Sequence, residues 1–138
     1  MPANTDFDKA AVFARVQKAA MEGIVRGTEN VRNEAVRLIL STPKTGKTYF
    51  RRGVEHRASA PGEAPASDTG RLVNSITTSY MPEKTAGRVT ARTEYAAYLE
   101  FGTQTMEPRP FMRPALTNMI DRIEADVEGA ISRVLGTK

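Results

Sequence analysis

The chain has 138 residues, enough to bury one hydrophobic core, and this length predicts a single domain. It contains no cysteine, so disulfides and thiolate-bound zinc are excluded, and no apolar run approaches the roughly 20 residues of a membrane span. Residues 1–6 lack the basic start of a signal peptide, so we expect none. The net charge is +4, and residues 44–57 carry the whole excess, with five basic side chains against Glu55 alone.

Residues 8–40 are predicted to form one long helix, because apolar or small residues recur every three or four positions and so share one face. Asp6 or Asp8 would cap its first turn, and the proline that follows would end it. Gly23 and Gly27 would either bend the helix or let another helix cross it closely. The expected apolar face comprises Phe13, Val16, Ala20, Ile24, Gly27, Val31, Ala35 and Leu38.

The stretch STPKTGKTYF, residues 41–50, ends like a phosphate-binding loop, but Ser41 stands in place of the first glycine and no helix is predicted to follow. We therefore expect no nucleotide here, and no cofactor elsewhere. Instead, residues 44–68 are predicted to form a protruding basic hairpin, with Gly53 near its turn, and a Pro/Gly-rich loop. This hairpin suits DNA or an acidic protein surface, or it is a solvated element without a partner. Its basic side chains are Lys44, Lys47, Arg51, Arg52 and Arg57.

A second hairpin is predicted from residues 75–80 and 88–93, where alternating β-branched residues flank a turn. Just before it, Asp68 or Thr69 would cap a short helical turn through residues 71–73. The two strands should pair antiparallel and form a small sheet.

Residues 95–102 fit a short amphipathic helix that Gly102 ends, with Tyr95, Tyr98 and Leu99 on one face. A second long helix is predicted over residues 111–135, because a proline is tolerated in its first turn. Its apolar face comprises Ala115, Met119, Ile123, Val127, Ile131 and Val134. The order of elements predicts an α+β fold, in which two long amphipathic helices pack on a small antiparallel sheet and the basic hairpin protrudes.

The residues predict no enzyme. His56 is the one histidine, and as a general base it would need a nucleophile such as Ser59 and an orienting group such as Asp68 placed around it. Glu94 and Glu100 fall on different faces of the short helix, so they do not form the facing carboxylate pair of a glycosidase. We therefore expect neither a catalytic nor a metal site.

Two longer stretches are more specific. SAPGEAPASDTGRLVNSI, residues 59–76, is a Pro-rich loop that ends in Asp-Thr-Gly-x-Leu. YAAYLEFGTQTMEPRPFMRPAL, residues 95–116, contains an aromatic pair, Glu-Phe-Gly-Thr and Arg-Pro-Phe-x-Arg-Pro-Ala. These 40 residues, with the predicted helices and hairpin around them, resemble the neck, or tail-completion, protein family of long-tailed bacteriophages.

The resemblance implies a virion structural protein of the head–tail junction, assembled in the bacterial cytoplasm. It would form a ring, six-fold by the same resemblance, between head-closure proteins and tail-tube or terminator proteins, without membrane contact. Such rings use heterologous interfaces. Two other functions stay open. One is a tail terminator that caps the tail tube, and the other is a small basic nucleic-acid-binding protein that stacks Tyr49 and Phe50 on bases.

The resemblance also implies which residues matter. Gly70 and Gly102 would permit backbone shapes that other residues resist, and Arg109 and Arg113 would pair with a carboxylate such as Glu100 of the same or the next subunit. The aromatic side chains expected to anchor the loop are Tyr95, Tyr98, Phe101 and Phe111. The full motif, expected either at a subunit interface or only in packing of the fold, is Thr69, Gly70, Arg71, Leu72, Tyr95, Tyr98, Glu100, Phe101, Gly102, Thr103, Arg109, Pro110, Phe111, Arg113 and Pro114.

Overall fold

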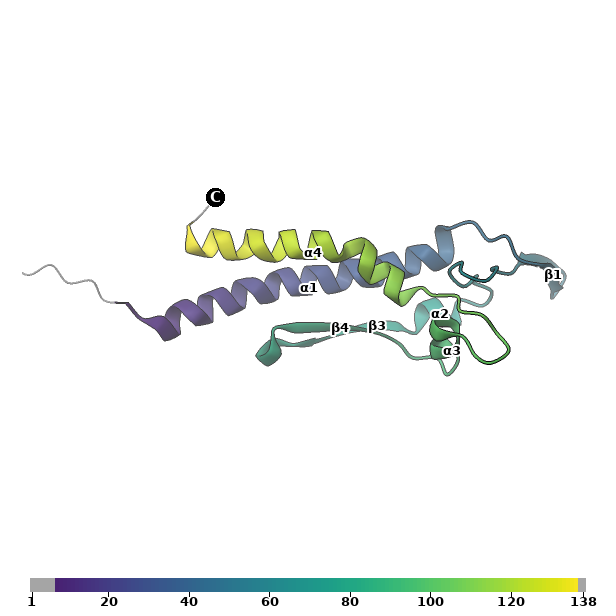
Figure 1. The fold of residues 1–138 in the computed structure, drawn as a ribbon, viewed down its shortest axis with the longest axis horizontal. Helices are drawn as coiled ribbons and strands as arrows, with labels where there is room; N and C mark the ends of the chain where they lie inside the picture. Colours follow the sequence, from purple (N-terminus) through teal and green to yellow (C-terminus); the bar gives the residue numbers. More distant parts are fainter. Residues whose placement is uncertain (1–6, 137–138) are drawn as a thin grey trace, which may run out of the picture.

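The computed structural model describes residues 7–136 and confirms the predicted α+β fold. Helices α1 and α4 lie side by side and antiparallel, the β3–β4 hairpin lies along the other side of α1, and the β1–β2 hairpin extends beyond the end of the helix pair (Figure 1). No helix within the described residues combines the length and apolarity needed to cross a membrane. In chain order the elements are α1 (Lys9–Ser41), β1 (Thr48–Arg51), β2 (Val54–Arg57), α2 (Arg71–Asn74), β3 (Ile76–Met81), the 3₁₀ turn η1 (Pro82–Lys84), β4 (Ala86–Ala91), α3 (Ala96–Phe101) and α4 (Met112–Leu135).

Helix α1 begins and ends at positions that the sequence predicts. The Asp8 carboxylate accepts the Ala11 N–H at 3.1 Å and caps the first turn, while the alternative cap, Asp6, lies outside the described residues. The helix ends at Ser41, because Pro43 favours an extended backbone at the residue before it.

The predicted apolar face of α1 is correct in its middle and wrong at its start. Ala20, Gly27, Val31 and Ala35 are buried, whereas Phe13 is 61% exposed. The last turn of α4 meets α1 at Arg15, whose guanidinium donates to the Val134 carbonyl. Helix α4 therefore ends before it can cover Phe13.

Helices α1 and α4 approach closely because two glycines of α1 face α4. A Cβ atom at Gly23 would lie 2.9 Å from the Val127 Cα atom, and one at Gly27 would lie 2.7 Å from Ile123 Cγ1. Either distance is shorter than real Cβ contacts, so a larger residue would push the helices apart. Of the two predicted roles for these glycines, the structure therefore adopts the close crossing, and α1 runs unbroken from Lys9 to Ser41.

A buried carboxylate joins the same two helices. Glu34 of α1 is 6% exposed, and both of its carboxylate oxygens accept hydrogen bonds from the Arg37 guanidinium at 2.7 and 2.8 Å. Asn118 of α4 donates to it at 3.0 Å. These bonds, above all those from Arg37, lower the pKa of Glu34, so its charged form is retained in the interface.

The best-buried large side chains lie where the C-terminal half of α1 meets β3 and the start of α4. Leu72 of α2 and Ala96 of α3 pack into the same cluster, so all helices of the described chain contribute to it. The large side chains that are fully buried there are Ile39, Ile76 and Phe111.

The β3–β4 hairpin has a shorter turn than the sequence predicts. Its strands are Ile76–Met81 and Ala86–Ala91, because η1 and the positive φ of Thr85 (49°) reverse the chain early. The hairpin is held to α1 by Glu29, whose carboxylate accepts the Thr78 hydroxyl at 2.8 Å and also the Tyr80 hydroxyl. It therefore extends the core cluster along α1.

Replacing Gly23 with alanine should destabilise the protein. Alanine ordinarily stabilises a helix by about 1 kcal/mol over glycine, but here the added methyl group would contact the α4 backbone, and overpacking costs about 1–3 kcal/mol. We expect G23A to lower the free energy of unfolding in urea by up to about 2 kcal/mol, which is the overpacking cost less the gain in helix propensity. The matched control is G129A, whose Cβ would lie 3.6 Å from the Arg133 guanidinium, an ordinary contact. It should be at least as stable as the unsubstituted chain, and an equal loss in both variants would contradict the close crossing.

Candidate functional site

The two sequence motifs, residues 59–76 and 95–116, are brought together at one end of the helix pair. The Gly62 N–H donates to the Pro108 carbonyl at 3.0 Å, and the Arg109 guanidinium donates to the Ser59 carbonyl at 3.3 Å. Both bonds join the Pro-rich loop of the first motif to the proline loop of the second. The motifs therefore form a single structural unit.

Glu100 fixes the start of α4. Its carboxylate accepts the backbone N–H groups of Phe111, Met112 and Arg113 at 2.8, 2.9 and 2.8 Å. A carboxylate is favoured there because the first N–H groups of a helix lack partners within the helix and carry partial positive charge. Pro114 fits the same turn, since it has no N–H group that needs a partner.

The expected partners of Glu100 are thus corrected. The sequence predicts ion pairs from Arg109 or Arg113 to this carboxylate, but within this chain it is occupied by backbone N–H groups. The Arg109 guanidinium lies against the Ser59 carbonyl instead, and Arg113 is exposed beside the capped turn. The resemblance implied side-chain pairs with Glu100 of the same or the next subunit, whereas within this chain the carboxylate caps a helix.

The loop between α3 and α4 is tightly built. Gly102 has φ 76°, and a Cβ atom there would lie 2.8 Å from the Met106 carbonyl oxygen and 2.9 Å from Pro108 Cδ. Only glycine fits, as predicted. The Thr103 N–H donates to the Met106 carbonyl at 2.8 Å, and the Arg109 N–H donates to the Leu99 carbonyl at 2.6 Å. Together with the half-buried Pro110, these contacts hold the loop against α3.

The four aromatic residues of the second motif divide into two groups. Phe111 is fully buried and Tyr95 is partly buried, so these two anchor the loop as predicted. Tyr98 and Phe101 are 58% and 68% exposed, so the prediction that they anchor it within the chain is wrong. Tyr95 is the N-cap of α3 with helical φ and ψ, and the Leu99 N–H donates to its carbonyl at 3.1 Å, so the predicted helical spacing to Tyr98 holds although Tyr98 is exposed.

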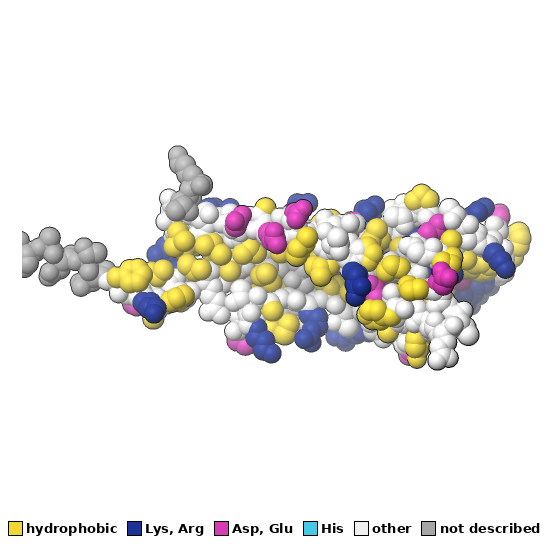
Figure 2. Space-filling model, in the orientation of Figure 1, with side chains coloured by type: hydrophobic (Ala, Val, Ile, Leu, Met, Phe, Trp, Pro, Cys, Tyr) yellow, Lys and Arg dark blue, Asp and Glu magenta, His cyan; other side chains and the backbone are white. Residues whose placement is uncertain are grey.

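Beside Phe101 lies an open groove between α1, β4 and α4, with a volume of about 500 Å³. Its walls are largely apolar, and two of its α4 side chains, Leu116 and Ile120, are 48% and 39% exposed. Hydrophobic side chains also form a visible band along the helix pair, with acidic side chains over α4 next to it (Figure 2). We name the open groove beside Phe101 the α4 groove. The apolar side chains that line it are Ile24, Val31, Val89, Phe101, Met112, Leu116, Ile120 and Ile123.

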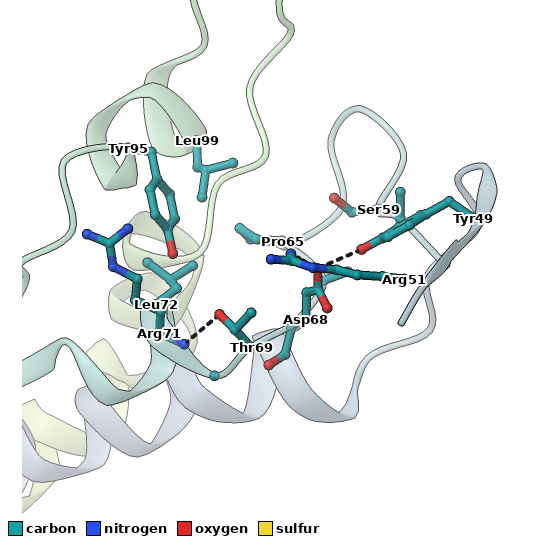
Figure 3. A pocket seen from close by; sticks show the side chains of 14 residues that line it. Tyr49, Arg51, Ser59, Pro65, Asp68, Thr69, Arg71, Leu72, Tyr95 and Leu99 are labelled. Atoms are coloured by element: carbon teal, nitrogen blue, oxygen red, sulfur yellow. Dashed lines mark hydrogen bonds and ion pairs between the residues drawn. The ribbon is translucent and has the colours of Figure 1, made fainter. Parts of the chain in front are cut away.

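A second cavity, of about 490 Å³, lies between the β1–β2 hairpin and the two motifs (Figure 3). Asp68 stands at its centre. The Arg51 guanidinium pairs with this carboxylate at 2.5 Å, the Tyr49 hydroxyl donates to it at 3.3 Å, and His56 Nε2 lies 3.7 Å away. The bond from Arg51 is the main cause of the lowered pKa of Asp68. One face of the hairpin is therefore tied to the first motif.

The predicted basic patch is smaller than the sequence suggests. Arg51 is paired with Asp68, and Lys44 donates to the Leu38 carbonyl and the Thr42 hydroxyl at 2.9 and 2.7 Å, at the end of α1. Burial lowers the pKa of Lys44. Arg51 remains 51% exposed despite its pair, and the exposed basic side chains of the hairpin that take part in no ion pair among residues 7–136 are Lys47, Arg52 and Arg57.

Glu63 fastens the loop to the base of this hairpin. Its carboxylate accepts the Thr45 hydroxyl, the Ala60 N–H at 2.8 Å and the Thr45 N–H at 3.0 Å. These three bonds lower the pKa of Glu63 to about 2, and the bond from the Thr45 hydroxyl contributes most to this shift. Sequence reasoning missed this residue, because a glutamate in a Pro-rich loop gives no signal of what it will contact.

Helix α2 begins differently from the prediction. The N-cap position of this helix is occupied by Gly70, with φ 77°, and not by Asp68 or Thr69. The Thr69 hydroxyl oxygen accepts the Arg71 N–H at 3.4 Å, and Asp68 is engaged by the hairpin. The Arg71 guanidinium pairs with Glu94 at 2.7 Å. Leu72 is buried in the core.

Among the described residues, His56 is not placed to activate Ser59. His56 stacks on Tyr49 with ring centroids 5.5 Å apart, and among the described residues no hydrogen bond joins it to Ser59. A nucleophile would need that contact to be activated. Within residues 7–136, no three metal-binding side chains gather into a candidate metal site.

No protein-family profile, characterised protein or solved structure matches the chain.

Replacing Glu100 with alanine should destabilise the chain more than a surface substitution does. The variant would leave three N–H groups at the start of α4 without their acceptor, and losing a helix cap costs about 0.5–2 kcal/mol. We expect E100A to lower the free energy of unfolding by about 2 kcal/mol, with E100Q intermediate because an amide oxygen still accepts. The control is E107A, in the exposed part of the same loop, which should have little effect. If E100A were as stable as E107A, the capping role would be wrong.

Proposed function

We propose that this protein is a virion structural protein of the neck of a long-tailed phage, where it completes the tail by assembling into a ring. The observation that carries the proposal is the union of the two motifs. Residues 59–76 and 95–116 are far apart in sequence, yet hydrogen bonds between Gly62 and Pro108 and between Arg109 and Ser59 join them. A chance likeness of two separate stretches would not require them to form one unit.

The surface of the isolated chain supports assembly. Three large side chains are fully buried, whereas many large hydrophobic side chains are exposed. Exposed apolar surface of this extent is typical of proteins that bury it against partners. In this proposal the exposed aromatic residues of the second motif, Tyr98 and Phe101, belong to a contact between subunits. The other exposed hydrophobic side chains near the motif unit are Phe50, Val54, Leu116 and Ile120.

The ring is a proposal that rests on the resemblance, as is its six-fold symmetry. Its neighbours would be the head-closure protein on one side and a tail-tube or terminator protein on the other, within the virion. The elongated helix pair, with a hairpin at one end and a groove along its side, offers two different surfaces (Figure 1). Two different surfaces are what a heterologous, ring-closing contact requires.

Electron microscopy of a lysate from phage lacking this gene tests the proposal. A neck protein that completes the tail should leave DNA-filled heads beside free tails of normal length, because heads and tails assemble separately and fail to join. Restoring the gene in trans is the control and should restore joined particles. Tails of uncontrolled length would instead assign the protein to the terminator function. Intact infectious particles would contradict both.

Nucleic-acid binding is the second candidate, since Lys47, Arg52 and Arg57 are exposed on the hairpin together with Phe50, which is 74% exposed. Each phosphate neutralised on duplex DNA contributes about −0.9 to the slope of log affinity against log salt. Three free basic side chains therefore predict a slope of about −3 in a titration of the protein against duplex DNA. The triple variant K47A/R52A/R57A should lose this slope, and K44A, at the end of α1, is the matched control. Affinity that is independent of salt, or undetectable, would remove this candidate.

A further inference from the structure

The α4 groove has acidic side chains along the part of its border beyond Ile120, while Arg113 lines it near the start of α4. Asp121, Glu124 and Glu128 are exposed, and at positions i, i+3 and i+7 they form a stripe on α4 next to Leu116 and Ile120. Within residues 121–128 there are four acidic side chains against one basic. The stripe of acidic side chains over α4 is visible beside the hydrophobic band (Figure 2).

Within residues 7–136, the three side chains of this stripe have no ion pair with a basic side chain. The fourth acidic residue, Asp126, lies 3.9 Å from the Arg26 guanidinium, but among residues 7–136 no ion pair reaches Asp121, Glu124 or Glu128. Like charges at i and i+4, as at 124 and 128, destabilise a helix. The acidic side chains therefore repel one another within α4, and a basic partner would relieve this repulsion.

The β1–β2 hairpin has the opposite character. All four residues of β1 are exposed, and only His56 of β2 is partly buried. The register pairs Phe50 with Glu55 and Thr48 with Arg57, so these four side chains share one face, while Tyr49 and Arg51 on the other face contact Asp68. A two-stranded hairpin without a packed face is marginally stable in water.

The outer face of this hairpin therefore carries an apolar anchor with Glu55 directly opposite it and basic side chains toward both ends. Phe50 is 74% exposed at its centre, Arg57 stands on the same face, and Arg52 occupies the turn. Basic side chains are visible at this end of the molecule, as they are beside the β3–β4 hairpin (Figure 2). On the inner face Tyr49 and Arg51 already contact Asp68 of the first motif, so the aromatic anchor available to a partner is Phe50 of the outer face.

We propose that the outer face of the β1–β2 hairpin of one copy docks into the α4 groove of a second copy. Phe50 would enter between Leu116 and Ile120, and Arg52 and Arg57 would face the acidic stripe of Glu124 and Glu128. The occupant is a second copy because this chain carries both halves of a complementary pair, an apolar groove with an acidic border and an apolar anchor with a basic border. The inference rests on the proposed ring, and it supplies the heterologous contact that such a ring needs.

Site-directed cross-linking tests the docking, because the chain has no cysteine of its own. Two single-cysteine variants are made, T48C on the hairpin face beside Phe50 and T117C beside the α4 groove, and one carries a mass tag. Mixed and treated with a short bismaleimide, they should give the mixed dimer as the main product. The matched control replaces T48C with V54C, which is exposed but on the other face of the hairpin. A mixed-dimer yield no greater than that of this control would overturn the docking.

Further substitutions test the chemistry of the contact. Adding F50S to T48C should abolish most of the mixed dimer, since the anchor is lost. Adding R52E and R57E to T48C should reduce the yield of the mixed dimer severalfold. Pairing this charge-reversed hairpin with a T117C chain that also carries E124K and E128K should restore the yield. Restoration would require the charges to face each other across two copies, and its failure would overturn the proposed pairing of hairpin and acidic stripe.

Failure here and failure of the proposed function are distinguishable. If the mixed dimer is absent while the gene deletion still yields unjoined heads and tails, the protein is a neck protein whose subunits meet through other surfaces. If the deletion yields infectious particles, the neck function is wrong whatever the cross-linking shows. A mixed dimer in that case would indicate a self-associating protein of another kind.

Discussion

One carboxylate, that of Glu100, determines how the second half of the chain is arranged. It belongs to α3, yet it satisfies three N–H groups at the start of α4. A helix start is directional, because its free N–H groups point along the axis and attract an anion. Once α3 is packed on the core through Ala96, the position of Glu100 sets where α4 begins and which way it runs. Phe111, at the cap position, then enters the core.

The direction of α4 determines the rest of the helix pair. From this start α4 runs back along α1 and meets Gly27 and then Gly23, where the absence of side chains lets the backbones approach. Close approach brings Asn118 to the buried Glu34. The same geometry leaves Leu116 and Ile120 at the edge of the helix contact, half exposed, and so produces the α4 groove. The groove is therefore a consequence of how the helices cross, and not of a separate element.

The sequence predicts elements whose signals are local. Apolar spacing, Asp8 and Pro43 bound α1 nearly to the residue, since periodicity and capping act within a few positions along the chain. It fails where a side chain's partner is distant. Nothing local indicates that α4 ends short of Phe13 or that Arg51 is neutralised by Asp68.

The candidate site follows the same rule. Gly102 was predicted correctly, because a positive φ in a tight loop is a local requirement. Glu100 was identified as important, but its expected partners were the guanidinium groups of Arg109 and Arg113, whereas the structure uses backbone N–H groups, which have no sequence signature. Tyr98 and Phe101 look like core residues in the sequence. Only the three-dimensional arrangement places them outside.

Basic and acidic side chains lie in separate regions of this molecule, each beside exposed apolar surface, and this separation does not stabilise the monomer. The hairpin gathers basic side chains around Phe50 although it has no core of its own, and α4 gathers acidic side chains beside an open groove. Interspersing the two signs would have relieved the repulsion within each set. Separate patches of opposite sign, each beside exposed apolar surface, instead favour contact between copies in one relative orientation. In the proposed docking, the marginal hairpin and the acidic stripe complete each other on neighbouring subunits.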